Sequence, residues 1–240
     1  MQAPALLAAL LLLAGCDAVP AGPAPQPAPA AAPAAAPRFP APDRPVAAIV
    51  SDQWSDEESR DNAREAETVF GHLAIRPGLT VADIGAGSGY YTVRLAPAVL
   101  PGGRVFANDI MPDYLNRLRR RVSEAGLTNV EFILGDAGDA KLPQASTDIA
   151  LMVHMYHEIE DPYQLLWRLH DSLKPGGRVA IIDADRPTSR HGTPPSLLRC
   201  ELAAAGFQQV GFHELELGNY LAIFVAGTRP VPEAIRPCRA

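Results

Sequence analysis

The hydrophobic pattern of residues 55–227 alternates between two kinds of segment. Apolar positions recur every three or four residues over 55–73, which predicts a helix. Beyond it, short apolar runs bounded by glycine or polar residues predict strands, and amphipathic stretches predict helices. We expect strands at 79–84, 104–109, 129–134, 148–153 and 177–183, and helices at 90–98, 112–125, 161–173 and 195–206. Brief apolar strands that alternate with helices are typical of a parallel sheet covered on both faces.

The last part of this region has a different pattern. Residues 207–217 and 220–225 are two β-rich runs, and Gly218-Asn219 between them has the composition of a hairpin turn. Together with the five preceding strands, this predicts an α/β fold. We expect a doubly wound, seven-stranded, mostly parallel sheet that closes with a C-terminal antiparallel hairpin.

The first 47 residues lack this alternation. Residues 5–14 form an apolar run of ten, about half of what a membrane-spanning helix needs, so they predict a signal-peptide core. Ten of the 24 prolines lie between Pro20 and Pro45, among alanines. Such a segment buries too little apolar surface to fold and predicts an extended tether. The chain therefore divides into a signal peptide (1–15), a tether (16–47), a folded domain (48–229) and a C-terminal tail (230–240).

The residues after the apolar run, Leu13-Ala14-Gly15-Cys16, resemble the signal of bacterial lipoproteins. The resemblance implies cleavage before Cys16, lipidation of Cys16 and a membrane anchor of several acyl chains, which is stable where one chain is marginal. It places the domain in the bacterial cell envelope, at the periplasmic face, and Asp17 resembles the enteric signal for inner-membrane retention. Met1-Gln2 lacks the usual positive charge, and with a mis-assigned start codon the protein would be cytoplasmic.

The charge of the chain argues against nucleic acid as a partner. The formal net charge is −6, and it belongs to residues 48–240 because the charges of the first 47 residues cancel. Binding to a phosphate backbone needs clustered cations instead. The oligomeric state is left open by the sequence.

Two cysteines follow the N-terminal one. Cys200 and Cys238 can pair in an oxidising compartment. Alternatively, Cys200 fits the apolar face of a helix with Leu197 and Leu198, as a free buried thiol.

A glycine-rich turn follows the first expected strand. Asp83-Ile84-Gly85-Ala86-Gly87-Ser88-Gly89 lies between that strand and the next helix. Glycine permits a tight turn and close approach of a ligand, and a helix N-terminus offers N–H groups to an anion. Tyr90 stands where a dinucleotide fingerprint has a third glycine or an alanine, which argues against NAD. No Gly-Lys-Ser/Thr follows, so a mononucleotide P-loop is also excluded.

This turn and three later elements resemble the class I S-adenosylmethionine-dependent methyltransferases, over roughly residues 55–227. In the first motif, the resemblance assigns cofactor contacts to Asp83, Gly85, Gly87 and Gly89. It places Asp109, at the expected spacing for ribose recognition, near the ribose hydroxyls. Asp136 falls near the adenine amino group, although it also fits a simple turn. The turn at 173–178 and the terminal hairpin match as well. The family implies a Rossmann-like methyltransferase fold, S-adenosylmethionine as cofactor and a small-molecule methyl acceptor.

Candidate catalytic residues follow the fourth and fifth expected strands, because chemistry in open parallel sheets occurs beyond the carboxyl ends of the strands. His157 resembles the histidine that small-molecule methyltransferases often carry after the fourth strand. His154 and His191 are the other candidates. A histidine that titrates near neutrality can remove the proton of a hydroxyl or amine acceptor. Otherwise these side chains only satisfy loop backbone groups.

The same segments contain potential metal ligands. The set consists of His154, His157, Glu158, Asp183, Asp185 and His191. Their spacing matches no recognised zinc signature, and the family resemblance supplies a metal-free account, so we expect no metal. The domain also lacks the set of cysteines that arsenic methylation, a known branch of the family, would need.

Two further features could border the cofactor. Tyr90 and Tyr91 either wall the cofactor, face its sulfonium by cation–π contact, or pack in the core. Arg60, Asp61 and Arg64, on the helix before the first strand, could cover it as a lid.

Two functional hypotheses remain, because an envelope location is at odds with a cofactor made in the cytoplasm. The first is an active methyltransferase. The alternative is a catalytically inactive, envelope-anchored binding module that keeps the methyltransferase fold, since a fold alone does not establish catalysis. A nucleotide-dependent oxidoreductase is disfavoured by Tyr90.

Overall fold

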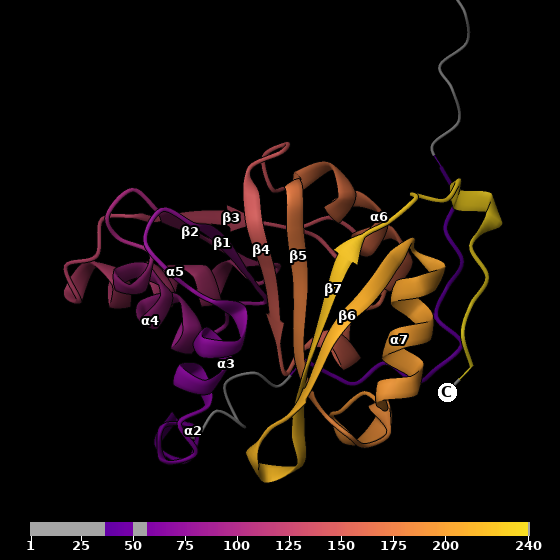
Figure 1. Cartoon of the computed structure of the whole chain (residues 1–240), viewed down its shortest axis with the longest axis horizontal. Helices are drawn as coiled ribbons and strands as arrows, with labels where there is room; N and C mark the ends of the chain where they lie inside the picture. Colours follow the sequence, from indigo (N-terminus) through magenta and orange to yellow (C-terminus); the bar gives the residue numbers. More distant parts are fainter. Residues whose placement is uncertain (1–36, 50–56, 240) are drawn as a thin grey trace, which may run out of the picture. The chain divides into compact units, whose positions relative to one another are not determined.

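A seven-stranded sheet forms the centre of the molecule (Figure 1). The computed structural model describes residues 37–49 and 57–239, and one compact unit begins at Pro37. The strand order is β3-β2-β1-β4-β5-β7-β6. The strands are β1 Thr80–Ile84, β2 Arg104–Asp109, β3 Val130–Leu134, β4 Thr147–Val153, β5 Leu173–Ala184, β6 Phe207–Glu214 and β7 Asn219–Ala226. The first five are parallel, and β7 runs antiparallel to β5 and β6, which confirms the predicted sheet and its terminal hairpin.

Helices cover both faces of the sheet, as the short apolar strands require. They are α2 Glu57–Asn62, α3 Glu65–Leu73, α4 Tyr90–Ala98, α5 Pro112–Glu124, α6 Pro162–Ser172 and α7 Pro195–Ala204. Along β4, Ala150 and Met152 face the core beneath α6 and α7. Ile149 and Leu151 alternate with them and face the core beneath α3 and α4. The central strands of the sheet are therefore buried on both sides, and their carboxyl ends are left for a site.

Most elements lie within two residues of their predicted bounds, and three differ. The single helix expected at 55–73 is broken into α2 and α3, because Arg64 has a left-handed backbone with φ of 51°. β5 begins at Leu173, since Thr147 pairs with Leu173 before a bulge and the register resumes between Ile149 and Arg178. β6 ends at Glu214, three residues earlier than expected.

The compact unit includes residues that the sequence assigns to the tether. The predicted domain begins at residue 48, whereas Arg44 is already buried and forms an ion pair with Glu201 of α7. The backbone N–H of Ala47 donates to the carbonyl of His157 at 3.0 Å. We call residues 37–49 the N-terminal strap. The predicted signal peptide, Cys16 and the rest of the tether lie outside the described residues.

Cys200 of α7 and Cys238 of the C-terminal segment form a disulfide. The alternative of a free buried thiol is wrong for Cys200, because Leu197 and Leu198 are buried while Cys200 is exposed. Within 37–49 and 57–239, no helix has both the length and the apolar character that crossing a bilayer demands.

Candidate active site

Three glycines with left-handed backbone shape the turn between β1 and α4. Their φ values are 69° at Gly85, 53° at Gly87 and 88° at Gly89, a region that other residues rarely adopt. A Cβ atom on Gly89 would lie 2.1 Å from Cδ1 of Leu118. Gly85 and Gly87 line the cavities described below. Gly89 lines neither of them and serves instead as the N-cap of α4, packed against α5.

Asp109 connects this turn to the end of β2. The buried carboxylate accepts hydrogen bonds from the backbone N–H of Gly87 through Oδ2 and of Met111 through Oδ1, each at 2.9 Å. Both oxygens of the carboxylate therefore take part in holding the turn and the start of the next helix. Asp109 is therefore fixed in place by the turn that it helps to shape.

A smaller cavity, of about 130 Å³, opens beside Asp109. Ile84, Ile110 and Asp136 also line it. The backbones of Asp136 and Asp139 exchange hydrogen bonds, and the side chain of Asp136 is more than half exposed. Asp136 is thus both a turn residue and a cavity residue, and the two interpretations of the sequence are compatible.

Asp83 lies near the end of β1 with its side chain almost fully buried. Its Oδ2 accepts a hydrogen bond of 2.6 Å from the hydroxyl of Thr92. Burial raises the pKa of Asp83 to about 6, because the loss of hydration outweighs the hydrogen bond from Thr92, which lowers it. The carboxyl group is therefore mostly ionised at pH 7 and protonated in mild acid.

A larger cavity, of about 380 Å³, adjoins the smaller one, since Gly85 and Glu158 line both. Asp83 and Gly87 form part of its wall on the side of the glycine turn. The wall also contains all three candidate catalytic histidines, His154, His157 and His191. The structure thus gathers residues from the ends of β1, β4 and β5 around one space, as expected for an open parallel sheet.

His157 lies on a short 3-10 turn after β4, η1 Tyr156–Glu158, and is held by Asp183 near the end of β5. Its Nδ1 atom lies 3.0 Å from Oδ2 and 3.1 Å from Oδ1 of Asp183. The hydroxyl of Thr193 donates to the same Oδ2 at 2.7 Å. Because a carboxylate only accepts hydrogen bonds, this arrangement favours a proton on Nδ1 and a lone pair on Nε2.

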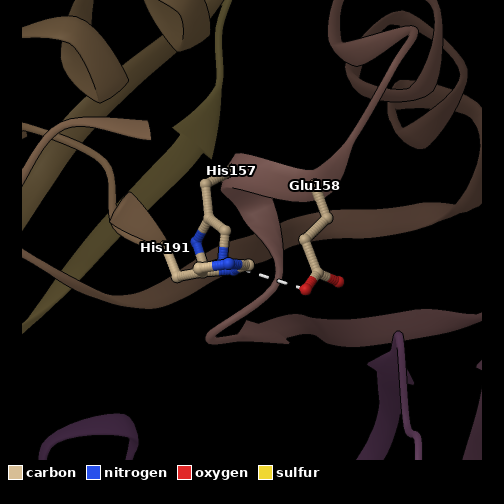
Figure 2. A group of neighbouring side chains, drawn as sticks. All are labelled: His157, Glu158 and His191. Carbon is tan, nitrogen blue, oxygen red and sulfur yellow. Dashed lines mark ion pairs between the residues drawn. The ribbon is translucent and has the colours of Figure 1, made fainter. Parts of the chain in front are cut away.

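Figure 2 shows the ring of His191 beside that of His157, with the carboxylate of Glu158 directed toward the two rings. Nε2 of His157 lies 4.0 Å from Oε1 of Glu158. The ring centroids of the two histidines are 5.5 Å apart. Burial, together with the neighbouring His157 and Arg186 side chains, lowers the pKa of His191. Its imidazole is therefore neutral at pH 7.

His154 lines the same cavity but has a different partner. Its Nε2 atom lies 3.1 Å from Oε2 of Glu65 on α3. Arg60 and the hydroxyl of Tyr91 donate to the other oxygen of Glu65. Burial by itself would raise the pKa of Glu65, but His154 and Arg60 together lower it to about 2. His154 therefore belongs to the cluster around Glu65. The other two candidate histidines, His157 and His191, have their rings beside each other.

Arg60, one of the predicted lid residues, contacts both of the tyrosines that could border the cofactor. Its guanidinium carbon lies 3.8 Å from the ring centroid of Tyr90 and 5.2 Å from that of Tyr91. A cation of the chain itself therefore lies over the two aromatic rings that were candidates for contact with a sulfonium. Of the three predicted lid residues, Arg60 lines the larger cavity, Asp61 accepts a hydrogen bond from Tyr90, and Arg64 pairs with Glu67 at the surface.

Three charged residues of the larger cavity were not singled out as site residues from the sequence. Arg186 and Arg190 stand on the loop after β5 with His191. Their place beyond the carboxyl end of a strand is a signal that could have indicated them. Glu65 precedes β1, and only the packing of α3 on the sheet brings it to the cavity.

Comparison with known proteins links this site to methyl transfer. Residues 81–177 match a family model described as a methyltransferase domain. The chain is 31% identical over 158 residues to an arsenite methyltransferase of Halobacterium salinarum, which covers 60% of this chain and 40% of that protein. It is 31% identical over 115 residues to a demethylmenaquinone methyltransferase of Listeria monocytogenes, 48% of each chain. The chain thus spans less than half the length of these curated relatives.

Among solved structures, a SAM-dependent methyltransferase from Aquifex aeolicus has the same fold. The TM-score is 0.60 at 26% identity, and the alignment covers 66% of this chain and 88% of that one. The seven-stranded sheet is therefore a Rossmann-like methyltransferase fold. The segment that matches the family model runs from β1 to the first residues of β5 and contains the glycine turn, Asp109, Asp136 and His157. Both the fold and the matched segment are therefore similar to those of methyltransferases.

Proposed function

We propose that the chain transfers the methyl group of S-adenosylmethionine to a small-molecule acceptor. The observation that carries this proposal is the pair of adjoining cavities that share Gly85 and Glu158. The smaller cavity offers Asp109 and Asp136, whose carboxylates can accept hydrogen bonds from ribose hydroxyls and an adenine amino group. The larger cavity offers Asp83 for a cationic amino group and has a volume in the range of small-molecule sites.

The residues present fit an adenosyl cofactor. Gly85 borders both cavities, and a Cβ atom there would lie 2.9 Å from the side chain of Met155, so the backbone approaches the cavity where a side chain could not. Asp109 stands at one cavity and Asp83 at the other, so carboxylates are available for both ends of an extended, partly cationic molecule. An NAD-type fingerprint is still absent, because Tyr90 follows the third glycine of the turn.

A histidine that lines the larger cavity can accept the proton that the methyl acceptor loses. When bound, S-adenosylmethionine supplies a methyl carbon that the acceptor's lone pair attacks in line, as the carbon–sulfur bond breaks and S-adenosylhomocysteine leaves. In the metal-free site, Nε2 of His157 receives the acceptor's proton, and Asp183 stabilises the resulting imidazolium through Nδ1. Holding the two reactants in line supplies much of the acceleration.

The acceptor is proposed only as a class. Arsenite, named for one relative, is disfavoured here because Cys200 and Cys238 are joined in a disulfide. The third cysteine, Cys16, lies outside the described residues. His157 lines this cavity and can accept a proton. An acceptor with a dissociable proton, such as a hydroxyl, an amine or an aromatic ring carbon, therefore fits better than a metalloid that needs thiolates.

A methyl-transfer assay tests this function. The full chain is incubated with isotopically labelled S-adenosylmethionine and a panel of catechol, quinol, amine and thiol acceptors. We expect labelled product from at least one acceptor, loss of product in Asp109→Ala, and retention in Glu124→Ala, an exposed carboxylate on α5. Cofactor binding without product from the whole panel would favour the inactive binding module instead.

We also propose that the chain is anchored at the periplasmic face of the bacterial envelope by lipid on Cys16. The Cys200–Cys238 disulfide supports this, because disulfides persist in oxidising compartments and are rare in the cytosol. Mass spectrometry of the mature N-terminus provides the test. Acylated Cys16 as the first residue is expected, and an unmodified Cys16 or a retained Met1 would contradict the proposal.

A further inference from the structure

A second use of the side chains in Figure 2 follows from their geometry. We propose that His157, Glu158 and His191 bind a divalent transition-metal ion. Two imidazoles and one carboxylate are an established ligand set for zinc and for non-haem iron(II), and they leave coordination positions open. The spacing of these residues in the sequence gave no metal signature, because His191 reaches the turn after β4 from the loop after β5.

The three ligand atoms are close to the separations that a metal requires. One nitrogen of each histidine and one oxygen of Glu158 all lie within 4.8 Å of one another. Metal–ligand bonds of roughly 2.0–2.2 Å place neighbouring ligand atoms about 3.0–3.5 Å apart. A shift of about 1 Å per atom therefore closes the site. Small rotations of Glu158 and His191 within the cavity that both line can supply it, although the side chain of Glu158 is only 8% exposed.

His157 is already oriented as a metal ligand. Asp183 holds its Nδ1 atom, and Asp183 is itself fixed by the hydroxyl of Thr193 and by the backbone N–H of Ala184 at 2.9 Å. This is the carboxylate–histidine arrangement found behind metal-bound imidazoles, where the outer carboxylate fixes the tautomer and strengthens the ligand. A histidine that only packed in the core would not need a buried carboxylate behind one nitrogen and a cavity before the other.

The position of the group suggests what the metal does, and this part rests on the proposed function. All three residues line the larger cavity, and Glu158 also borders the smaller one. Open coordination positions would therefore face the space proposed for the acceptor. A metal lowers the pKa of a bound hydroxyl, so the acceptor class would be a chelating hydroxyl compound such as a catechol. In the metal-loaded site the acceptor's proton leaves to solvent, because Nε2 of His157 is then a ligand.

The test uses the full chain, freed of metal with a chelator, and Co²⁺ as the probe, because its visible spectrum reports nitrogen and oxygen coordination. Glu158→Gln and His191→Ala each remove one ligand and leave the His157–Asp183 pair intact. His213→Ala is the matched control, since its ring stacks on that of His72 at 3.8 Å and this pair could bind metal adventitiously. Binding of S-adenosylmethionine is measured without metal on the same samples, and circular dichroism shows independently that each variant is folded.

We expect one equivalent of Co²⁺ to bind, with affinity at least about 10-fold weaker in Glu158→Gln and His191→Ala and unchanged in His213→Ala. The absence of saturable binding, or binding that only His213→Ala reduces, would overturn the metal site. Failure of the parent chain to bind Co²⁺ while it still binds S-adenosylmethionine refutes the metal site alone. Co²⁺ binding at this group without cofactor binding refutes the proposed function and leaves the metal site standing.

Discussion

Arg44 and Glu201 are 157 positions apart in the sequence and form an ion pair in which both side chains are fully buried, with Nε and Oε1 3.0 Å apart. The same guanidinium donates to the carbonyls of Tyr156 and His157, each at 3.3 Å. The hydroxyl of Tyr156 donates to Glu201 at 2.8 Å. The N-terminal strap therefore holds the turn that carries His157 and Glu158, and it joins the site to α7.

Replacing Arg44 with methionine should destabilise the protein strongly. Arg44→Met leaves Glu201 buried without its cation, and an uncompensated buried charge costs about 3–5 kcal/mol. Chemical denaturation of the full chain measures the free energy of unfolding. Arg38→Met, at an exposed position of the same strap, should change it by less than about 0.5 kcal/mol. An equally small effect of Arg44→Met would show that the strap does not support the site.

Gly89→Ala should be destabilising through the backbone. Its φ of 88° costs an alanine about 1–2 kcal/mol, and the new methyl group would also displace Leu118. Thermal unfolding checks this against Gly71→Ala, a position inside α3 with no atom within 4 Å of the added methyl group. That control should be stabilising by about 0.5–1 kcal/mol. A Gly89→Ala protein as stable as the parent would mean that the turn can adopt another conformation.

The raised pKa of Asp83 predicts a specific dependence of stability on pH. Between about pH 4 and 6 the folded chain binds a proton that the unfolded chain has released, so this group's contribution falls as pH rises. Relative to Asp83→Asn, the free energy of unfolding of the parent should drop by about 2 kcal/mol from pH 4 to pH 7. Denaturation at several pH values measures the difference.

Glu65 serves as the control, because its pKa is shifted in the opposite direction to that of Asp83. Its pKa of about 2 in the folded chain lies below the ordinary value of 4.5, so its stabilising contribution is present above about pH 4.5 and is lost toward pH 2. Relative to Glu65→Gln, the parent should therefore gain stability as pH rises through this range. A constant difference in either comparison would contradict the assigned environment of that carboxyl group.

Asp183→Asn should impair turnover without impairing cofactor binding. An asparagine amide can donate to Nδ1 of His157 and so favour the tautomer that lacks a lone pair on Nε2. We expect kcat to fall by about 10²–10⁴-fold, the contribution of general base catalysis. The neighbouring exposed residue supplies the control, Asp185→Asn, with unchanged kcat. Normal turnover of Asp183→Asn would remove His157 from the proton step.

The sequence was sufficient for most of the fold. The apolar runs of β1, β2 and β4 and the amphipathic pattern of α5 are local properties, so their bounds are nearly those of the structure. The glycine turn and Asp109 were identified for the same reason, since the chemistry of the turn requires both the residue types and their spacing.

The remaining features depend on contacts that no local pattern encodes. The Ala/Pro composition predicts a tether for the whole of residues 16–47, yet Arg44 is fixed by a partner on α7. Glu65 reaches the site only because α3 packs on the sheet, and the pairing of Cys200 with Cys238 depends on where the C-terminal segment lies. The proximity of His191 to His157 and Glu158 arises in the same way, from loops that follow two different strands.

Calorimetric titration of the full chain with S-adenosylmethionine, S-adenosylhomocysteine and NAD tests the central claim most directly. The two cavities joined at Gly85 predict saturable binding of both adenosyl ligands and none of NAD. Binding should be lost in Asp109→Ala, which removes a carboxylate that lines the smaller cavity, and kept in Glu124→Ala. Failure of the parent chain to bind either adenosyl ligand, or equal binding by Asp109→Ala, would contradict the account.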